Sequence, residues 1–300
     1  MVILSKTDMI RRIMIGEMLL NDKKAESIIQ YLIKHDPEEL ENYFKQYFKE
    51  VAAEPTNLIK RRLKIKECVE DNFLNKNSEQ IKSFIIGTLR SVKNLGNYTD
   101  EIKPPILIDC ADPEFLQMAN YDLRLGEDVY VTTEKVPAKL NTMGKDGVVS
   151  IEPGEFGILM TYEYIFVPPD LMGFISIRLT HKQKGLVNIS GFHVDPGFYG
   201  RLMFAVFNAG PNDVPLRYKE RVFMVMFDEI SNNGLLKVKK GRWSGMDNIP
   251  VETLSGLRGT SVSVRNLDER IKRLETLFPL IITGVVGVVV AVVTWVLTHW

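Results

Sequence analysis

The sequence is poor in the residues that build disulfide frameworks and metal centres. It holds two cysteines in 300 residues, Cys68 and Cys110, with no Cys-x-x-Cys pair. That scarcity argues against a disulfide scaffold and against a structural zinc site. The histidines are scattered and do not pair at ligand spacing: His35, His181, His193 and His299. We therefore expect no resident metal site.

An excess of charge of one sign is also lacking. Lys and Arg number 38, Asp and Glu number 38, and the formal net charge is zero. This balance argues against a generally basic nucleic-acid-binding protein, so no nucleic-acid partner is expected, while a local phosphate site stays open. The first residues lack the basic start and apolar core of a signal peptide, so we expect the main body to be cytoplasmic.

One long uncharged run is present, at residues 277–300. It matches the ~20 apolar residues that a helix needs to cross a bilayer. Arg270, Lys272 and Arg273 precede it, which by the positive-inside rule puts that side in the cytoplasm. The run predicts a single-pass C-terminal anchor, most simply in a bacterial inner membrane. The alternative is a buried core segment.

Residues 262–276 carry apolar side chains at alternating spacings of three and four, beginning with Val264, Leu267, Ile271 and Leu274. This spacing forms a seam of about two heptads. It fits a short oligomeric coiled-coil stalk, and it fits equally a single amphipathic helix lying against the bilayer.

Residues 23–102 are charged and carry apolar residues at helical spacing, which predicts about three or four short helices. Breaks are expected near Asp36-Pro37, Glu54-Pro55-Thr56 and Asn75–Ser78, where turn and N-cap residues gather. The basic cluster 60–66 is most simply a solvated helix face. Contact with anionic lipid or with a nucleotide is the alternative.

From residue 103 to 235 the sequence pattern changes to short strand-like runs separated by Pro, Gly, Asn and Asp. Such spacing is typical of a compact all-β barrel or jelly roll. Residues 236–261 are expected to link this β domain to the stalk.

Several motifs in this region occur in a recognisable order. Residues 112–126 end in Asp-Leu-Arg-Leu-Gly, residues 178–186 read Arg-Leu-Thr-His-Lys-Gln-Lys-Gly-Leu, and residues 191–210 contain an Asp195-Pro-Gly corner. Together with residues 1–22, they resemble the dCTP deaminase/dUTPase superfamily. The resemblance implies a mainly β core, a distorted barrel or jelly roll that forms trimers. Residues 1–22 would supply its N-terminal helix and residues 23–102 an all-α insertion, with the transmembrane helix at the C-terminus.

What the resemblance implies for function is a pyrimidine deoxynucleotide bound between subunits of a homotrimer or higher oligomer. Asp195 matches the corner aspartate and is the candidate catalytic residue, although capping the Pro196-Gly197 turn is an equal alternative. Mg²⁺ would accompany a bound or cleaved triphosphate. The candidate nucleotide-binding residues are Arg178, Thr180, His181, Lys182, Gln183, Lys184, His193, Asp195, Phe198 and Tyr199.

The chain departs from the deaminase pattern at positions that matter for chemistry. Ala205 stands ten residues after Asp195, where a deaminase has its catalytic glutamate, and alanine cannot move a proton. Leu179, Gln183 and Met224 replace a serine, an arginine and a glutamine of the family. The resemblance implies that dUTPases also lack this glutamate, so Ala205 argues more strongly against deamination than against pyrophosphatase activity.

Three functions follow as hypotheses. The favoured one is a membrane-anchored nucleotide-binding protein with lost or altered catalysis, acting as a sensor or effector, for instance in bacterial antiviral defence. The second is an active dUTPase-like pyrophosphatase that uses Asp195 and Mg²⁺. The third is a trimeric scaffold whose helical insertion binds a protein partner.

Overall fold

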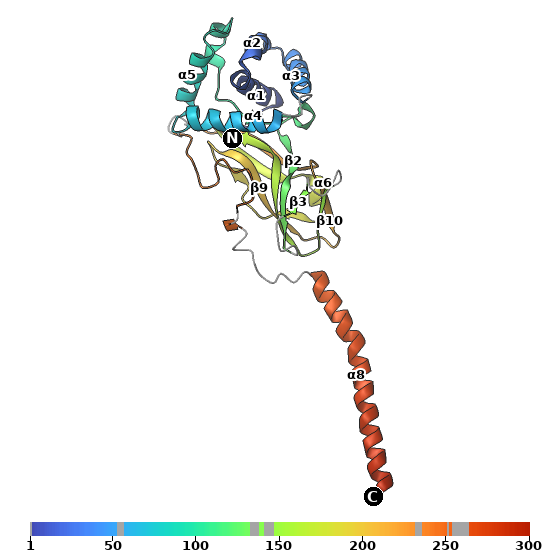
Figure 1. Cartoon of the computed structure of the whole chain (residues 1–300). Helices are drawn as coiled ribbons and strands as arrows, with labels where there is room; N and C mark the ends of the chain where they lie inside the picture. The colour runs from blue at the N-terminus through green and yellow to red at the C-terminus, as the bar shows by residue number, and fades with distance from the viewer. Residues whose placement is uncertain are drawn as a thin grey trace.

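The computed structural model describes residues 2–52, 57–132, 138–140, 147–231, 236–250, 252–253 and 264–300. A helical body and a β core lie against each other, and a long helix ends the chain (Figure 1). The helices are α1 (Lys6–Leu20), α2 (Ala25–Ile33), α3 (Pro37–Ala52), α4 (Asn57–Glu67), α5 (Ser78–Thr88), α6 (Leu179–Lys182) and α8 (Val264–His299), with a π-helical turn, η2 (Cys68–Phe73), after α4.

Capping residues fix where several helices begin. The Ser5 hydroxyl accepts a hydrogen bond from the Asp8 N–H at 3.2 Å at the start of α1. Pro37 is the first residue of α3, and the Asp36 carboxylate accepts from the N–H groups of the next two residues. Asn77 and Gln80 form a capping box at the start of α5. Side-chain oxygens thus satisfy N–H groups that a helix leaves unpaired, which confirms the expected breaks at Pro37 and Asn77. The expected break at 54–56 lies outside the described residues.

The β core is an antiparallel sheet with the strand order β7-β9-β5-β2-β11-β6-β8, to which β1 is added at β5 and β3 at β2. A separate pair is formed by β10 and β4. The strands are β1 (Leu107–Ile108), β2 (Tyr121–Val131), β3 (Ala138–Lys139), β4 (Val148–Ile151), β5 (Phe156–Phe166), β6 (Leu171–Ile177), β7 (Leu186–Asn188), β8 (His193–Val194), β9 (Tyr199–Asn208), β10 (Val214–Arg217) and β11 (Arg221–Glu229). Register shifts interrupt β2–β5, β5–β9 and β2–β11, and such irregularities bend a sheet.

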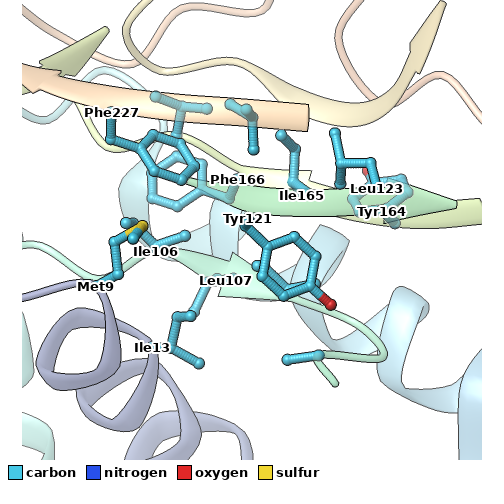
Figure 2. Close-up of a cluster of buried hydrophobic side chains, with 14 of the residues drawn as sticks. Met9, Ile13, Ile106, Leu107, Tyr121, Leu123, Tyr164, Ile165, Phe166 and Phe227 are labelled. Carbon is cyan, nitrogen blue, oxygen red and sulfur yellow. The ribbon is translucent and has the colours of Figure 1, made fainter. Parts of the chain in front are cut away.

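The main hydrophobic core joins α1 to this sheet (Figure 2). Met9 and Ile13 of α1 lie against Leu107 of β1, and above them stand aromatic residues such as Tyr121 and Phe227. All of these side chains are buried. Burying each large apolar side chain is worth about 1.5–3 kcal/mol, so the helix and the sheet stabilise each other. The expected fold class, a mainly β core with helical additions and an apolar C-terminal helix, is confirmed.

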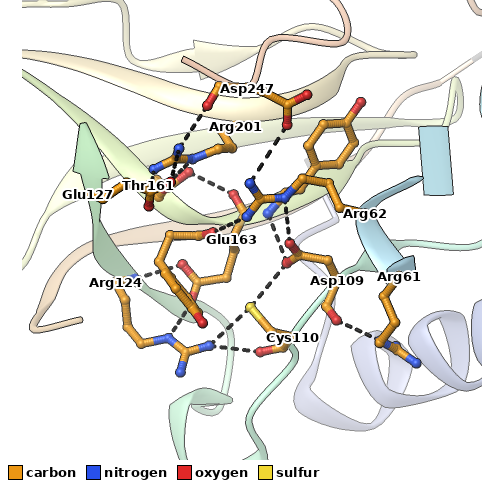
Figure 3. Close-up of polar contacts among 12 residues, drawn as sticks. Arg61, Arg62, Asp109, Cys110, Arg124, Glu127, Thr161, Glu163, Arg201 and Asp247 are labelled. Atoms are coloured by element: carbon orange, nitrogen blue, oxygen red, sulfur yellow. Dashed lines mark hydrogen bonds and ion pairs between the residues drawn. The ribbon is translucent and has the colours of Figure 1, made fainter. Parts of the chain in front are cut away.

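Arg201 of β9 sits at the centre of a buried polar network (Figure 3). Its side chain is 0% exposed, and its guanidinium donates to the carboxylates of Glu127 and Asp128 and to the Thr161 carbonyl. It also donates to the main-chain carbonyl of Asp247 at 2.8 Å. A buried charge is costly unless it is fully partnered. Moving the Asp247 carbonyl away would therefore leave the Arg201 guanidinium short of one acceptor.

The first part of the segment assigned by sequence to a linker, residues 236–250, is packed onto the body. Lys237 forms a bridge with Asn77, and Val238 is buried. Farther along, the Gly245 N–H donates to the Tyr199 carbonyl and the Arg201 N–H donates to the Met246 carbonyl. We call residues 236–250 the strap, because they hold the hairpin strand β9 and the helical body together.

The predicted stalk and apolar run form one continuous helix, α8, that passes through Pro279. Within it, Arg270–His299 is the one stretch of the described chain that is long and apolar enough to cross a membrane. The seam residues Leu267, Ile271, Leu274 and Phe278 are all exposed in the single chain.

Candidate functional site

The corner between β8 and β9 is a tight turn built on Asp195-Pro196-Gly197-Phe198. The two strands do not pair with each other, because β8 pairs with β6 whereas β9 pairs with β5 and β7, and we keep the word hairpin only as a name for residues 191–210. The Phe198 N–H donates to the Asp195 carbonyl at 3.1 Å, and Gly197 has a φ of +81°. Proline at the second and glycine at the third position are what a type II turn requires. A Cβ atom on Gly197 would lie 2.9 Å from the Cα of Val238 in the strap. Glycine is thus needed here for its conformation and for the close approach of the strap.

The turn presents Asp195 to solvent beside His193. The Asp195 side chain is 81% exposed, and its Oδ1 lies 3.4 Å from Nε2 of His193. The neighbouring Phe192 is exposed and stacks on Phe174, with ring centroids 6.2 Å apart. This corner therefore offers an accessible carboxylate and imidazole next to an aromatic ring, a combination that can order water or a ligand.

Tyr199 and Phe198, also predicted to bind nucleotide, turn inward. Tyr199 is buried, and its hydroxyl donates to Oε1 of Glu70 at 2.9 Å. Burial raises the pKa of Tyr199. Phe198 is half-buried against the main core. In this single chain both residues support the corner from beneath, and their role in binding stays a prediction.

The second predicted element, the loop 178–186, contains the short α6 turn. Thr180, Lys182, Gln183 and Lys184 are exposed on it. Arg178 is half-buried and pairs through Nε with Oδ2 of the buried Asp122 at 3.2 Å. Burial raises the pKa of Asp122 even though Arg178 and Arg221 counteract that effect. The loop thus begins with a cation, Arg178, that is held by Asp122, and it continues with exposed hydrogen-bond donors.

His181 does not share in this exposed surface. It is buried, its Nε2 lies 3.2 Å from the Arg221 carbonyl oxygen, and its Nδ1 has no hydrogen-bond partner among the described residues. Burial lowers the pKa of His181. A neutral, inward imidazole suits a packing role better than contact with phosphate.

The corner lies beside the first half of strand β6, and the loop begins where β6 ends. His193 pairs with Phe174 in the middle of β6 and Val194 with Gly173, whereas Arg178 comes directly after the last residue of the same strand. Arg178 is four positions beyond Phe174, or about 13 Å along an extended strand. One copy of the chain therefore does not bring Asp195 and the loop into a single pocket.

Ala205 lies on an apolar part of β9. It pairs with Ile158 of β5, and its carbonyl accepts from the N–H groups of Ile189 and Ser190. Alternate residues of β9 share a face, and Met203 and Phe207 flank Ala205 on that face. Met224 of β11 lies opposite Asp122 and Ser176. Ala205 is thus bordered by apolar side chains on its own face of β9.

Sequence reasoning missed Glu70, and it marked Asp122 only as the first residue of the Asp-Leu-Arg-Leu-Gly motif. Glu70 lies 129 residues before its partner Tyr199, and no local pattern in the π-helical turn marks it. Among the described residues, no group of three or more His, Cys, Asp or Glu side chains is arranged to hold a metal ion.

The sequence matches the dCTP deaminase-like family model over residues 94–230. The dCTP deaminase of Pyrococcus abyssi is 37% identical over 127 residues, which is 42% of this chain and 79% of that relative. The dUMP-forming dCTP deaminase of Methanothermobacter thermautotrophicus is 29% identical over 136 residues, 40% of this chain and 69% of the relative.

Among solved structures, the chain is similar to the 2′-deoxycytidine 5′-triphosphate deaminase of Agrobacterium tumefaciens, with a TM-score of 0.34 and 15% identity. That similarity covers 47% of this chain and spans 46% of the bacterial chain. The EIAV dUTPase gives a TM-score of 0.27 at 17% identity, over 42% of this chain and 95% of the viral one.

Proposed function

The chain belongs to the dCTP deaminase family, within the wider dCTP deaminase/dUTPase superfamily, and from that premise we propose that it binds a pyrimidine deoxynucleotide without deaminating it. The observation that carries the proposal is Ala205. At the place of the deaminase glutamate, β9 offers a methyl group among apolar neighbours, so the proton transfers of deamination have no carrier there.

Binding capacity is retained on two surfaces. Asp195 and His193 are exposed at the corner, while Lys182 and Lys184 rise from the loop above Arg178. Carboxylate and imidazole can orient a sugar or a water, and Lys and Arg make charge-assisted bonds to phosphate worth about 1.5–3 kcal/mol each. Mg²⁺ would enter bound to the triphosphate.

The nucleotide site is completed by a second copy of the chain. The corner and the loop are about 13 Å apart along β6, so a neighbour would have to supply one of them. Exposed apolar side chains beside Ala205, among them Val187, Ile189 and Phe207, favour coverage by such a neighbour. We infer a homotrimer with sites between subunits, the arrangement that the family resemblance implies.

The helix α8 anchors this assembly in a membrane. Its apolar residues are exposed along the whole stretch 270–299, and residues 277–300 carry no charged side chain. Exposed apolar surface of this extent is stable only when lipid or other helices cover it. A bound nucleotide would then be sensed by a body tied to the membrane, as expected for a sensor or effector.

Calorimetry on the full chain in detergent, with dCTP, dUTP and dTTP, tests binding. At least one should bind, and Asp195→Asn and Arg178→Ala should each weaken it at least about tenfold. The two variants can also be mixed in equal amounts and the oligomer reassembled. If each site takes Asp195 from one subunit and Arg178 from another, about a quarter of the sites regain both residues and should bind again. No binding of any of the three nucleotides would end the proposal. Dissociation to a monomer would end its intersubunit part.

A second candidate is supported by the exposed Asp195–His193 pair, which could activate water for cleavage of a triphosphate. Incubating the protein with dUTP and Mg²⁺ decides it. Release of pyrophosphate that Asp195→Asn abolishes would establish a dUTPase-like activity. Production of ammonia or of a uracil nucleotide from dCTP would contradict the favoured proposal directly.

A further inference from the structure

A cavity lies between the helical body and the β core, away from the Asp195 corner and the 178–186 loop. Its volume is about 920 Å³. One wall comes from α3 and α4, and the other from the segment after β1, from β2 and β5, and from the turn between β10 and β11. The volume falls in the range of small-molecule sites. The cavity depends on the helical segment, because α3 and α4 form that wall.

Cations line both walls. Lys45 and Lys49 come from α3 and Arg61 from α4, and Arg124 and Lys219 face them from the β core. Arg61 already holds Glu17 at 2.5 Å, and Arg124 holds the buried Glu163 at 2.6 Å. Each arginine keeps its Nη1 without a hydrogen bond to any described residue. Lys49 and Lys219 have no ion pair in the described part of the chain.

Three carboxylates also line the cavity, and two of them are already engaged. Asp109 accepts hydrogen bonds from Nε of Arg62 at 3.1 Å and from the Tyr164 N–H at 3.0 Å (Figure 3). Asp112 accepts from the N–H of Glu114. Glu114 itself is exposed at the rim. Glu114 at the rim is thus the one of the three carboxylates for which no hydrogen bond or ion pair from its side chain is seen among the described residues.

Two of these cations converge on one ring. Cζ of Arg124 lies 4.7 Å from the centroid of Tyr162, and Nζ of Lys219 lies 4.9 Å from the same centroid. Lys219 adopts a φ of +65°, a conformation that costs a non-glycine residue energy. A strained backbone thus holds the Lys219 side chain against the same ring that Arg124 contacts, so that both cations are kept at this wall of the cavity.

We propose that this cavity is a binding site for an organic phosphate of about nucleotide size. Phosphate oxygens would accept from Lys49 and Lys219 on opposite walls and from the Nη1 groups of Arg61 and Arg124. The apolar side chains of Phe48, Val51 and Leu58 would cover the organic part. The ligand would bridge the helical body and the β core, and the site shares none of the residues proposed for the hairpin pocket.

Calorimetry on the full chain in detergent tests this site, with ATP and pyrophosphate as probes. The double variant Lys49→Met/Lys219→Gly removes both lysines, and glycine suits the backbone at 219, so folding is preserved. The matched control is Lys60→Met/Asn94→Gly, an exposed lysine and a second positive-φ position outside the cavity. Arg178→Ala serves as the control for the hairpin pocket.

We expect wild type to bind at least one probe with a Kd below about 1 mM. The cavity variant should lose at least tenfold in affinity, while the matched control should keep it. Binding of ATP alone identifies a nucleotide, and binding of both probes identifies the phosphate groups as the recognised feature. The inference is overturned if wild type binds neither probe, if the cavity variant binds as wild type does, or if only Arg178→Ala abolishes binding. The cavity variant should still bind a pyrimidine deoxynucleotide. Failure of the cavity proposal can therefore be told apart from failure of the nucleotide-binding function proposed for the Asp195 corner and the 178–186 loop.

Discussion

The hydroxyl of Tyr199 donates a hydrogen bond of 2.9 Å to the carboxylate of Glu70, and this bond joins the hairpin strand to the helical body. Lys240 of the strap pairs with the same oxygen of Glu70 at 3.2 Å. The Glu70 carboxylate therefore joins its own π-helical turn to two segments that are far from it in the sequence, strand β9 and the strap.

Replacing Tyr199 by Phe should lower the free energy of unfolding by about 1–2 kcal/mol, because a bond to a charged acceptor is lost in a buried place. Tyr164→Phe is the matched control. The Tyr164 hydroxyl is buried and has no partner among the described residues, so its removal should be neutral or slightly stabilising. Urea denaturation measures both, and equal losses in the two variants would contradict the role given to the Glu70 bond.

Gly197→Ala should destabilise the hairpin by about 1–3 kcal/mol, since alanine at φ +81° is strained and its Cβ would press on Val238. Gly191→Ala, at a position with open space around the added carbon, should change little. Hydrogen exchange at the strap amides should rise in the first variant only. Unchanged exchange there would show that the strap does not depend on this contact.

Acid should weaken the fold through His181. Its pKa is lowered by burial, so the unfolded chain takes up a proton near pH 6.5 that the folded chain does not. This contribution to stability is complete above pH 6.5 and is lost as the pH falls below it. His181→Leu removes the group, so its melting temperature should fall less between pH 7.5 and 5.5 than that of wild type.

The matched control is His35→Asn, which removes an exposed histidine at a φ of +54° that asparagine tolerates. It should keep the acid sensitivity of wild type. If His35→Asn rather than His181→Leu flattens the profile, His181 is not the group responsible.

Ala205→Glu introduces the carboxylate that the family resemblance implies for a deaminase at this position, yet we expect no deamination of dCTP. The new side chain would stand among Met203, Ile158 and Phe207, where an unpaired carboxylate costs about 1–3 kcal/mol. An ammonia-release assay tests the first statement and denaturation the second. Rapid release of ammonia would show that the single substitution at 205 is what separates this chain from its relatives.

Local patterns predicted much of the architecture. Helices begin at Pro37 and directly after Asn77, as expected from a proline and a capping side chain. The Asp195-Pro-Gly sequence forms the expected tight turn, and the uncharged run after residue 276 is helical. These features depend on near neighbours or on composition, which a sequence displays directly.

What sequence did not reveal depends on distant partners. His181 stands among hydrogen-bond donors in the 178–186 loop, and the sequence therefore predicts that it binds nucleotide with them. In the structure it is buried against the main chain of Arg221. Residues 236–250 read as a linker, yet Arg201 and Asn77 hold them. The separation of Arg178 from Asp195 follows from the pairing of β6 with β8, and strand pairing is set by the whole sheet.

The docked strap also sets a limit on distance. Since the chain is fixed to the body as far as Ile249, which is 9% exposed, the reach toward α8 is counted from residue 250 and not from 236. At ~3.3–3.6 Å per residue, the chain between Pro250 and Val264 spans at most about 50 Å. The point where the chain leaves the body, Pro250, therefore stays within about 50 Å of the start of α8, which keeps the whole body close to whatever holds that helix.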